Sequence, residues 1–164
     1  STYYVLLCFS SGEMRLVEAA GGAIAASFGK QPSGIHAAQF VPSAPGTFVR
    51  VSNKSGAIQL YNVSQPQPMK TFKPGLAMTQ SMILLPGHNR LLLSAEDGAV
   101  LVLDMDQGHV CWRHDGGHTE TIFDCKFCPM DPNLLATCSF DRTVRIYSMH
   151  TLQCTKIIKC KGAL

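Results

Sequence analysis

Charged side chains are scarce in this sequence. Asp, Glu, Lys and Arg together make up 15% of its 164 residues, whereas about 25% is usual in soluble domains. The net charge is +3, and no block of Lys and Arg is longer than a pair. Nucleic-acid binding through a basic surface is therefore not expected. The apolar content of 46% is enough for a substantial core.

Long apolar segments are lacking too. The longest mostly apolar runs, such as YYVLLCF at residues 3–9, fall far short of the ~20 residues that a membrane helix needs. The first residues also lack the basic, apolar and small-residue order of a signal peptide. We therefore expect no membrane partner. The missing initial Met suggests that the chain is a segment of a longer protein.

The seven cysteines are an odd number, so a complete set of internal disulfides is excluded. Several lie in apolar, strand-like runs, where a free Cys behaves as a small hydrophobic residue; these are Cys8, Cys111, Cys125 and Cys138. This use of Cys predicts a reducing compartment, the cytoplasm or alternatively the nucleus.

Cys125 and Cys128 have the Cys-x-x-Cys spacing of zinc and redox sites. On an extended strand, however, residues three apart point to opposite faces of the sheet. The two thiols would then not converge on one metal ion. We expect no metal and no other cofactor.

Helical periodicity is rare, whereas runs of five to seven residues rich in Val, Leu, Ile and Phe recur along the whole chain. The sequence is therefore predicted to be all-β. Turns between two apolar strands recur at intervals of 44, 42 and 44 residues; they begin at Ser11, Ser55, Asp97 and Asp141.

A third strand follows each pair, and a further strand precedes the last three turns. That preceding strand ends in an apolar-apolar-Pro step at 40–42, 84–86 and 127–129, where Pro removes no ladder donor. The sequence thus predicts about four strands in every ~43 residues. Within a single domain of residues 1–164, the repeats are predicted at about 1–30, 31–74, 75–115 and 116–160.

The last repeat resembles the WD (WD40) repeat family. It opens with Gly117-His118, continues with IFDCKFCP, and carries Asp141 in its turn six residues before the strand-ending Tyr147. The other copies share the period and the turn but have lost most of these polar residues. The resemblance implies β-propeller blades of four antiparallel strands, about four of them, forming an incomplete propeller.

The resemblance also implies a buried structural tetrad made by His118, Thr137, Asp141 and Tyr147. In this arrangement the carboxylate orients the imidazole, the hydroxyl joins them, and an aromatic group completes the chain. Tyr147 stands where the family usually has Trp. A Ser-His-Asp type of enzyme would use similar groups, but the spacing and the strand-turn placement favour the structural role. The protein is expected not to be an enzyme.

Family contact positions, carried over by position, predict a partner-binding face. Phe123 and Phe140 are expected to be neighbours on it and to form an aromatic anchor. The full set is Thr121, Phe123 and Phe140 in the last repeat, Met78, Gln80 and Glu96 in the third, and His36 and Lys54 in the second. The function implied is a scaffold that binds other proteins or peptide motifs. The alternative is an RNA-binding surface, for which only Lys54 and Arg142 offer cations.

The first repeat lacks its first strand in the sequence, so an open sheet edge is expected. Open strand edges and uncovered apolar faces promote association. We therefore expect this chain to self-associate.

Overall fold

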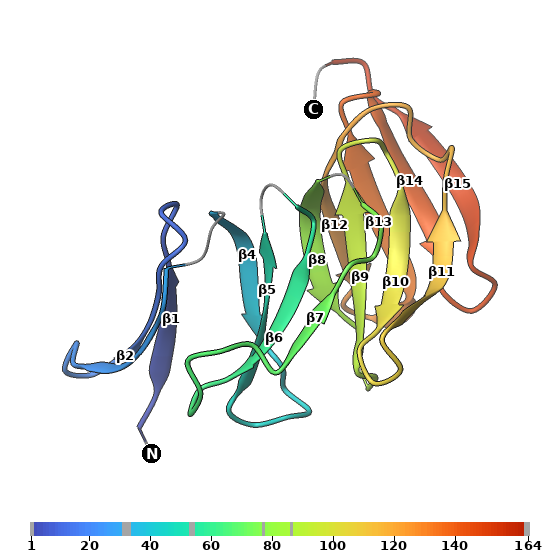
Figure 1. Ribbon diagram of the computed structural model, residues 1–164. Coiled ribbons are helices and arrows are strands. Elements are labelled where there is room, and N and C mark those ends of the chain that lie inside the picture. The colour runs from blue at the N-terminus through green and yellow to red at the C-terminus, as the bar shows by residue number, and fades with distance from the viewer. Residues whose placement is uncertain (1, 31–33, 53–54, 77, 86, 163–164) are drawn as a thin grey trace. The chain divides into compact units, whose positions relative to one another are not determined.

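The computed structural model describes residues 2–30, 34–52, 55–76, 78–85 and 87–162. The described residues fold into fifteen β-strands in four antiparallel sheets and contain no helix (Figure 1). The predicted all-β class and the sheet architecture are therefore confirmed. Within the described residues, no helix has the length and apolar character needed to span a membrane.

The first compact unit, residues 1–76, holds two sheets. The first sheet has three strands in the order β1-β2-β3, with bounds Tyr4–Cys8, Met14–Glu18 and Ile24–Phe28. The second sheet has four strands in the order β4-β5-β6-β7, with bounds Ile35–Phe40, Thr47–Ser52, Ile58–Asn62 and Lys70–Phe72.

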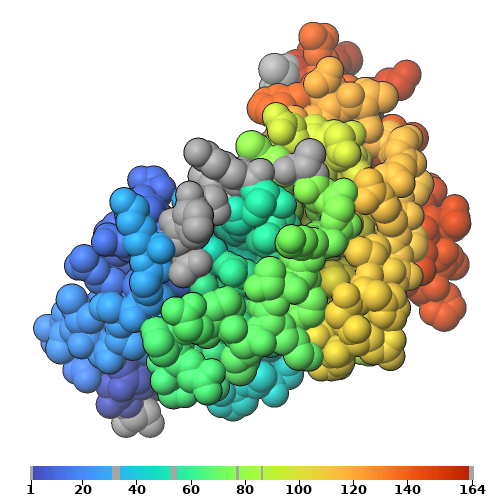
Figure 2. Space-filling view, in the orientation of Figure 1, coloured from blue at the N-terminus to red at the C-terminus, as the bar shows by residue number. Residues whose placement is uncertain are grey.

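The second compact unit, residues 77–164, holds two further four-stranded sheets. The third sheet pairs β8, β9, β10 and β11 in order, with bounds Thr79–Leu84, Arg90–Ala95, Val100–Asp104 and His109–His114. The fourth pairs β12, β13, β14 and β15, with bounds Ile122–Cys128, Asp131–Ser139, Thr143–Ser148 and Gln153–Lys159. In Figure 2, yellow and orange residues around β10 and β11 cover much of the visible face of this unit.

The burial of the strands explains their sequences. The middle strands β9 and β10 are almost entirely buried, and their unbroken leucine and valine runs suit strands that are covered on both faces. The outermost strand β11 alternates between exposed and half-buried residues, and its sequence HVCWRH alternates in polarity accordingly. The third sheet thus changes from a buried centre to an amphipathic outer strand.

Apolar packing between neighbouring sheets forms the core of each unit. In the second unit, residues of the third sheet such as Leu92 and Val102 pack against Ile122, Leu135 and Tyr147 of the fourth. In the first unit, Phe48 and Tyr61 stack with ring centroids 5.1 Å apart, and Phe28 packs edge-on against both. The repeats that lost the polar signature are therefore joined by apolar and aromatic contacts.

The β1–β2, β5–β6, β9–β10 and β13–β14 turns each contain a described residue with a left-handed backbone. This residue is Gly12, Gly56 or Gly98 in the first three sheets, but Arg142, with φ of 64°, in the fourth. At Gly98 a Cβ atom would lie 2.3 Å from the backbone oxygen of His118. Glycine at this position therefore allows the third sheet to approach the loop that begins the fourth.

Candidate functional site

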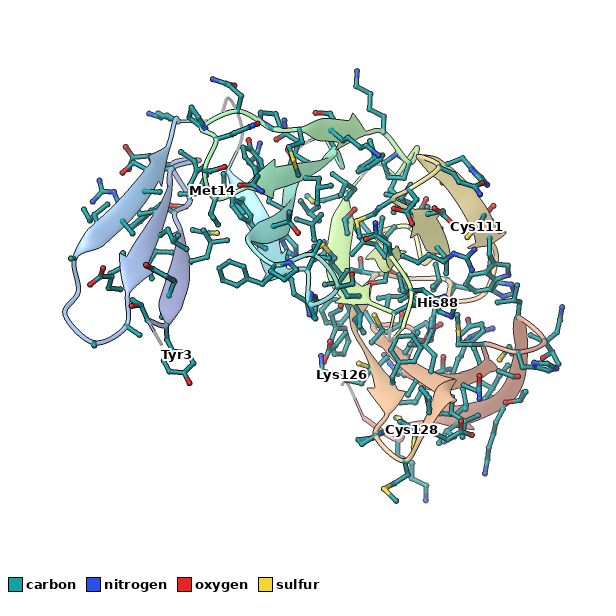
Figure 3. All side chains as sticks on the ribbon, turned by 90° about the horizontal axis from the view of Figure 1, so that it is seen from below. Tyr3, Met14, His88, Cys111, Lys126 and Cys128 are labelled. Carbon is teal, nitrogen blue, oxygen red and sulfur yellow. The ribbon has the colours of Figure 1, made fainter. Side chains whose placement is uncertain are left out.

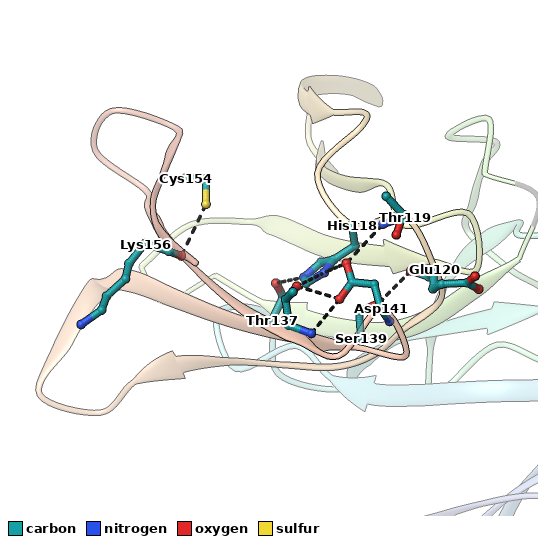
Figure 4. Close-up of polar contacts among 9 residues, drawn as sticks. His118, Thr119, Glu120, Thr137, Ser139, Asp141, Cys154 and Lys156 are labelled. Carbon is teal, nitrogen blue, oxygen red and sulfur yellow. Dashed lines mark hydrogen bonds and ion pairs between the residues drawn. The ribbon is translucent and has the colours of Figure 1, made fainter. Parts of the chain in front are cut away.

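The His118 side chain joins the loop before β12 to the turn after β13 (Figure 4). Its Nδ1 lies 2.8 Å from Oδ2 of Asp141, and its Nε2 lies 2.7 Å from Oγ1 of Thr137. The His118 side chain is fully buried and that of Asp141 is 6% exposed. The structure thus brings together three of the four residues predicted for the tetrad.

Asp141 is held by donors from two segments. Its Oδ1 accepts hydrogen bonds from the backbone N–H and the hydroxyl of Thr143, and its Oδ2 accepts one from the backbone N–H of Thr119. Burial raises the pKa of this carboxyl, but these bonds and the one with His118 outweigh it and lower the pKa to about 2. The sequence analysis assigned no role to Thr143. A turn Asp commonly bonds the residue two positions later, so the Asp-x-Thr pattern could have indicated it.

Burial lowers the pKa of His118, although the carboxylate of Asp141 opposes this shift. The neutral imidazole therefore donates from Nδ1 to Asp141 and accepts the Thr137 hydroxyl at Nε2. His118 is therefore protonated more readily in the unfolded chain than in the folded chain. It favours folding at pH values above its ordinary pKa of ~6.5, and this contribution to stability is lost as the pH falls below that value.

Tyr147 is buried beside this network but does not extend it. Its hydroxyl has no hydrogen-bond partner of normal geometry among the described residues. Burial raises its pKa to about 12, although Arg145 and Thr137 lie close enough to oppose that rise. The ring packs edge-on against His114, with centroids 5.4 Å apart. Gly117 leaves room for the hydroxyl, because a Cβ there would lie 2.8 Å from it.

A hydroxyl, an imidazole and a carboxylate in this order also form the hydrogen-bond chain of a nucleophilic triad. Thr137 is only 1% exposed and His118 only 2%. A substrate could reach the Thr137 hydroxyl only if the sheets separated. The arrangement can therefore position the loop before β12, but it presents no accessible nucleophile. No cluster of three or more metal-ligating side chains occurs within the described ranges.

Four of the predicted contact residues form a hydrogen-bonded row in the second unit. The backbone N–H of Glu96 donates to the Met78 carbonyl, and the Thr121 hydroxyl donates to the Glu96 carbonyl. The backbone N–H of Phe140 then donates to the carbonyl of Thr121. We call these four residues, together with Phe123, the loop face.

The remaining predicted positions in the first strands share one structural feature. His36, Gln80 and Phe123 are each the residue skipped at a register shift between the first and second strand of their sheet. Such bulges redirect a side chain and are frequent next to functional sites. The sequence period aligned these three positions but did not reveal the bulge. Lys54, the last predicted contact residue, lies outside the described residues.

Phe123 and Phe140 are neighbours. Their ring centroids lie 5.0 Å apart at an interplanar angle of 44°. Phe140 is 59% exposed, whereas Phe123 is partly buried. Met78 and Thr121 are also partly buried, and Glu96 is exposed. The loop face therefore presents an aromatic pair on a hydrogen-bonded backbone.

Replacing Asp141 with Ala should lower the free energy of unfolding by about 1–3 kcal/mol, because His118 and Thr143 would lose a buried partner. The matched control is Asp97→Ala. Asp97 occupies the corresponding turn of the third sheet and, among the described residues, accepts a hydrogen bond only from the N–H of Ala99, so the loss should be smaller. Because the pKa of Asp141 is lowered to about 2, the difference between wild type and Asp141→Ala should shrink as the pH falls from ~4 towards 2. Denaturant melts over this range measure it. An equal loss in both variants would contradict the role assigned to Asp141.

Replacing Tyr147 with Phe should leave the free energy of unfolding unchanged or raise it by up to ~1 kcal/mol, because the buried hydroxyl makes no regular hydrogen bond. Tyr147→Ala, which removes the packed ring, should cost about 3–5 kcal/mol. Thermal and denaturant melts distinguish the two variants. A loss of more than ~1 kcal/mol in Tyr147→Phe would contradict this prediction, because it would mean that the Tyr147 hydroxyl makes a stabilising hydrogen bond.

Three comparisons with known proteins agree with this geometry. Residues 109–148 match the family described as WD domain, G-beta repeat, and this match runs from β11 to the end of β14. The chain is 31% identical over 124 residues to transcription initiation factor TFIID subunit 5 of Drosophila melanogaster, covering 70% of this chain and 17% of the relative. It is 26% identical over 108 residues to the ribosome biogenesis protein ERB1 of Malassezia globosa, covering 66% of this chain and 12% of the relative.

Among solved structures, the WD40 β-propeller domain of Doa1 is similar, with a TM-score of 0.80 and 19% identity. The alignment covers 98% of this chain and 51% of that one, so the four sheets correspond to blades of an incomplete propeller. The chain thus spans only a part of each of these relatives. Residues 109–148 thus match a WD40 repeat, and the chain has the fold of WD40 β-propeller blades.

Proposed function

We propose that this chain is part of a non-enzymatic scaffold that binds partner proteins or peptide motifs on its loop face. The observation that carries the proposal is the contact between Phe123 and Phe140, with Phe140 59% exposed. An exposed aromatic pair is the kind of anchor that supplies much of the energy of protein interfaces.

The backbone beneath the pair supports this proposal. The N–H of Phe140 bonds the Thr121 carbonyl, and the Ser139 hydroxyl bonds the Glu120 carbonyl at 2.9 Å. The bulge at Phe123 holds the second ring beside the first. A surface fixed before binding loses little conformational entropy when a partner arrives.

The relatives are compatible with a role in assemblies. One is named as a subunit of a transcription initiation factor and the other as a ribosome biogenesis protein. Residues 117–147 also resemble a stretch of WD repeat-containing protein 17, and we propose a longer protein of that kind as the source of the chain. All seven cysteines are free thiols, which supports a reducing location, in the cytoplasm or the nucleus.

Replacing both Phe123 and Phe140 with Ala should abolish the capture of specific partners, because it removes the apolar anchor. Affinity enrichment from a cross-linked cell lysate, quantified by mass spectrometry, measures this. The matched control is Met130→Ala: Met130 is also apolar and is 91% exposed, but it lies in the connection between β12 and β13, at the other end of the fourth sheet.

Proteins captured by wild type and by Met130→Ala, but lost with the double variant, would support the proposal. Melting temperatures of all three proteins confirm that the comparison is made on folded chains. If the double variant captures the same proteins as wild type, the loop face is not the docking surface. Salt-sensitive binding of a single-stranded RNA at this face would instead favour the alternative function.

We also propose that the chain self-associates through β1. Among the described strands, β1 pairs with β2 alone, so its other edge is open. Tyr4, Val5 and Leu7 on this strand are each more than 40% exposed. An open apolar strand edge favours pairing with another chain. Light scattering at micromolar concentration should therefore detect dimers or larger species, and a monodisperse monomer would contradict this expectation.

A further inference from the structure

A second concave surface lies between the third and fourth sheets, away from the loop face. Consecutive turns of an antiparallel sheet lie at opposite ends, so the β14–β15 turn is at the other end of β14 from Asp141. Here a pocket of about 530 Å³ opens between the sheets. We call it the rear pocket. Its volume is in the range of ligand-binding clefts, and Figure 3, seen from below, labels two of its lining residues, His88 and Cys111.

The wall of the rear pocket is apolar on several sides. Val102 and Trp112 contribute from the third sheet, Phe127 from the end of β12, and Leu152 from the β14–β15 turn. Two basic residues, His88 and Arg90, also line the pocket, and no Asp or Glu is among the described residues that line it. The lining of the pocket therefore combines apolar and basic side chains.

Leu152 has an unusual backbone. Its φ is 57°, in the left-handed region, where a bulky side chain is strained. Leu152 lies four residues after the end of β14. The residue at the same distance after β2 and after β10 is glycine: Gly22, with φ of 70°, and Gly108, with φ of 78°. The fourth sheet thus replaces the unstrained residue with a leucine whose side chain lines the pocket. Strained residues concentrate at functional sites.

Arg90 can take part in binding despite its ion pair. Its Nε donates to Oδ2 of Asp104 at 3.0 Å, and 42% of its side-chain surface remains exposed. Asp104 itself is nearly buried and also accepts the backbone N–H groups of Asp106 and Gln107. A guanidinium has five N–H donors, so Arg90 can hold Asp104 and a second carboxylate together.

We propose that the rear pocket binds a peptide segment of a partner protein that inserts one apolar or aromatic side chain and offers an adjacent carboxylate to Arg90. The apolar lining residues favour the first group, and Arg90 and His88, with no carboxylate among the described lining residues, favour the second. This proposal concerns a different surface from the loop face and does not depend on it.

The probe is a set of short, fluorescently labelled peptides in which a Glu-Leu, Glu-Phe or Glu-Trp pair is flanked by Gly and Ser. Matched peptides carry Lys in place of Glu, or Ala in place of the apolar residue. Fluorescence anisotropy against the whole chain should show saturable binding of at least one Glu peptide. Both matched peptides should bind about tenfold more weakly or worse. Equal binding of the Glu and Lys peptides would overturn the proposal.

Leu152→Gly is the decisive variant. It removes one side chain that lines the pocket, so peptide binding should weaken about tenfold. It also relieves the left-handed strain, so the melting temperature should stay unchanged or rise. Leu152→Asn, which tolerates this backbone, should behave similarly and serves as the second variant. The Phe123→Ala and Phe140→Ala double variant should bind the peptides as wild type does. If both Leu152 variants bind as wild type, or lose stability as a core deletion would, Leu152 only fills space and the proposal is wrong.

Discussion

The buried imidazole of His118 is the group on which the organisation of the second unit's loop face depends. Both ring nitrogens are away from water and need partners, and Asp141 and Thr137 supply them. These bonds fix the loop before β12 against β13 and the turn after it. Once that loop is fixed, the carbonyls of Glu120 and Thr121 can accept the Ser139 hydroxyl and the N–H of Phe140. The position of the aromatic pair thus follows from the burial of one histidine.

Both turns that flank β14 contain a left-handed residue other than glycine. The position of Arg142 is glycine in the three other sheets, and that of Leu152 is glycine in two of them. Arg and Leu do not stabilise these turns relative to Gly, since glycine adopts a left-handed backbone without strain. Each instead places a long side chain at one end of the fourth sheet, Arg142 beside the loop face and Leu152 in the rear pocket. The strain therefore points to surfaces at both ends of this sheet.

The sequence predicted the parts of the structure that repeat. The short apolar runs predicted the all-β class, and the resemblance to the WD repeat implied that His118, Thr137 and Asp141 meet, which the structure shows as hydrogen bonds. The bulge at Phe123 was not predictable, because a skipped residue is defined by the register with another strand. Residue types alone also do not determine that the Tyr147 hydroxyl lacks a regular hydrogen bond among the described residues, or that Leu152 has a left-handed backbone.

The difference between the sheets has an energetic reason. Removing one member of a buried polar network leaves its partners unsatisfied, whereas replacing the members together by apolar groups can be nearly neutral. The third sheet fits this rule: Leu93 and Leu103 occupy the positions of Thr137 and Tyr147 and are fully or almost fully buried. Asp97 remains there because it is exposed and needs only the N–H of Ala99. Polar signatures are therefore expected to disappear from a blade as a set, and a blade that keeps the set, as the fourth does, keeps a fixed loop before its first strand.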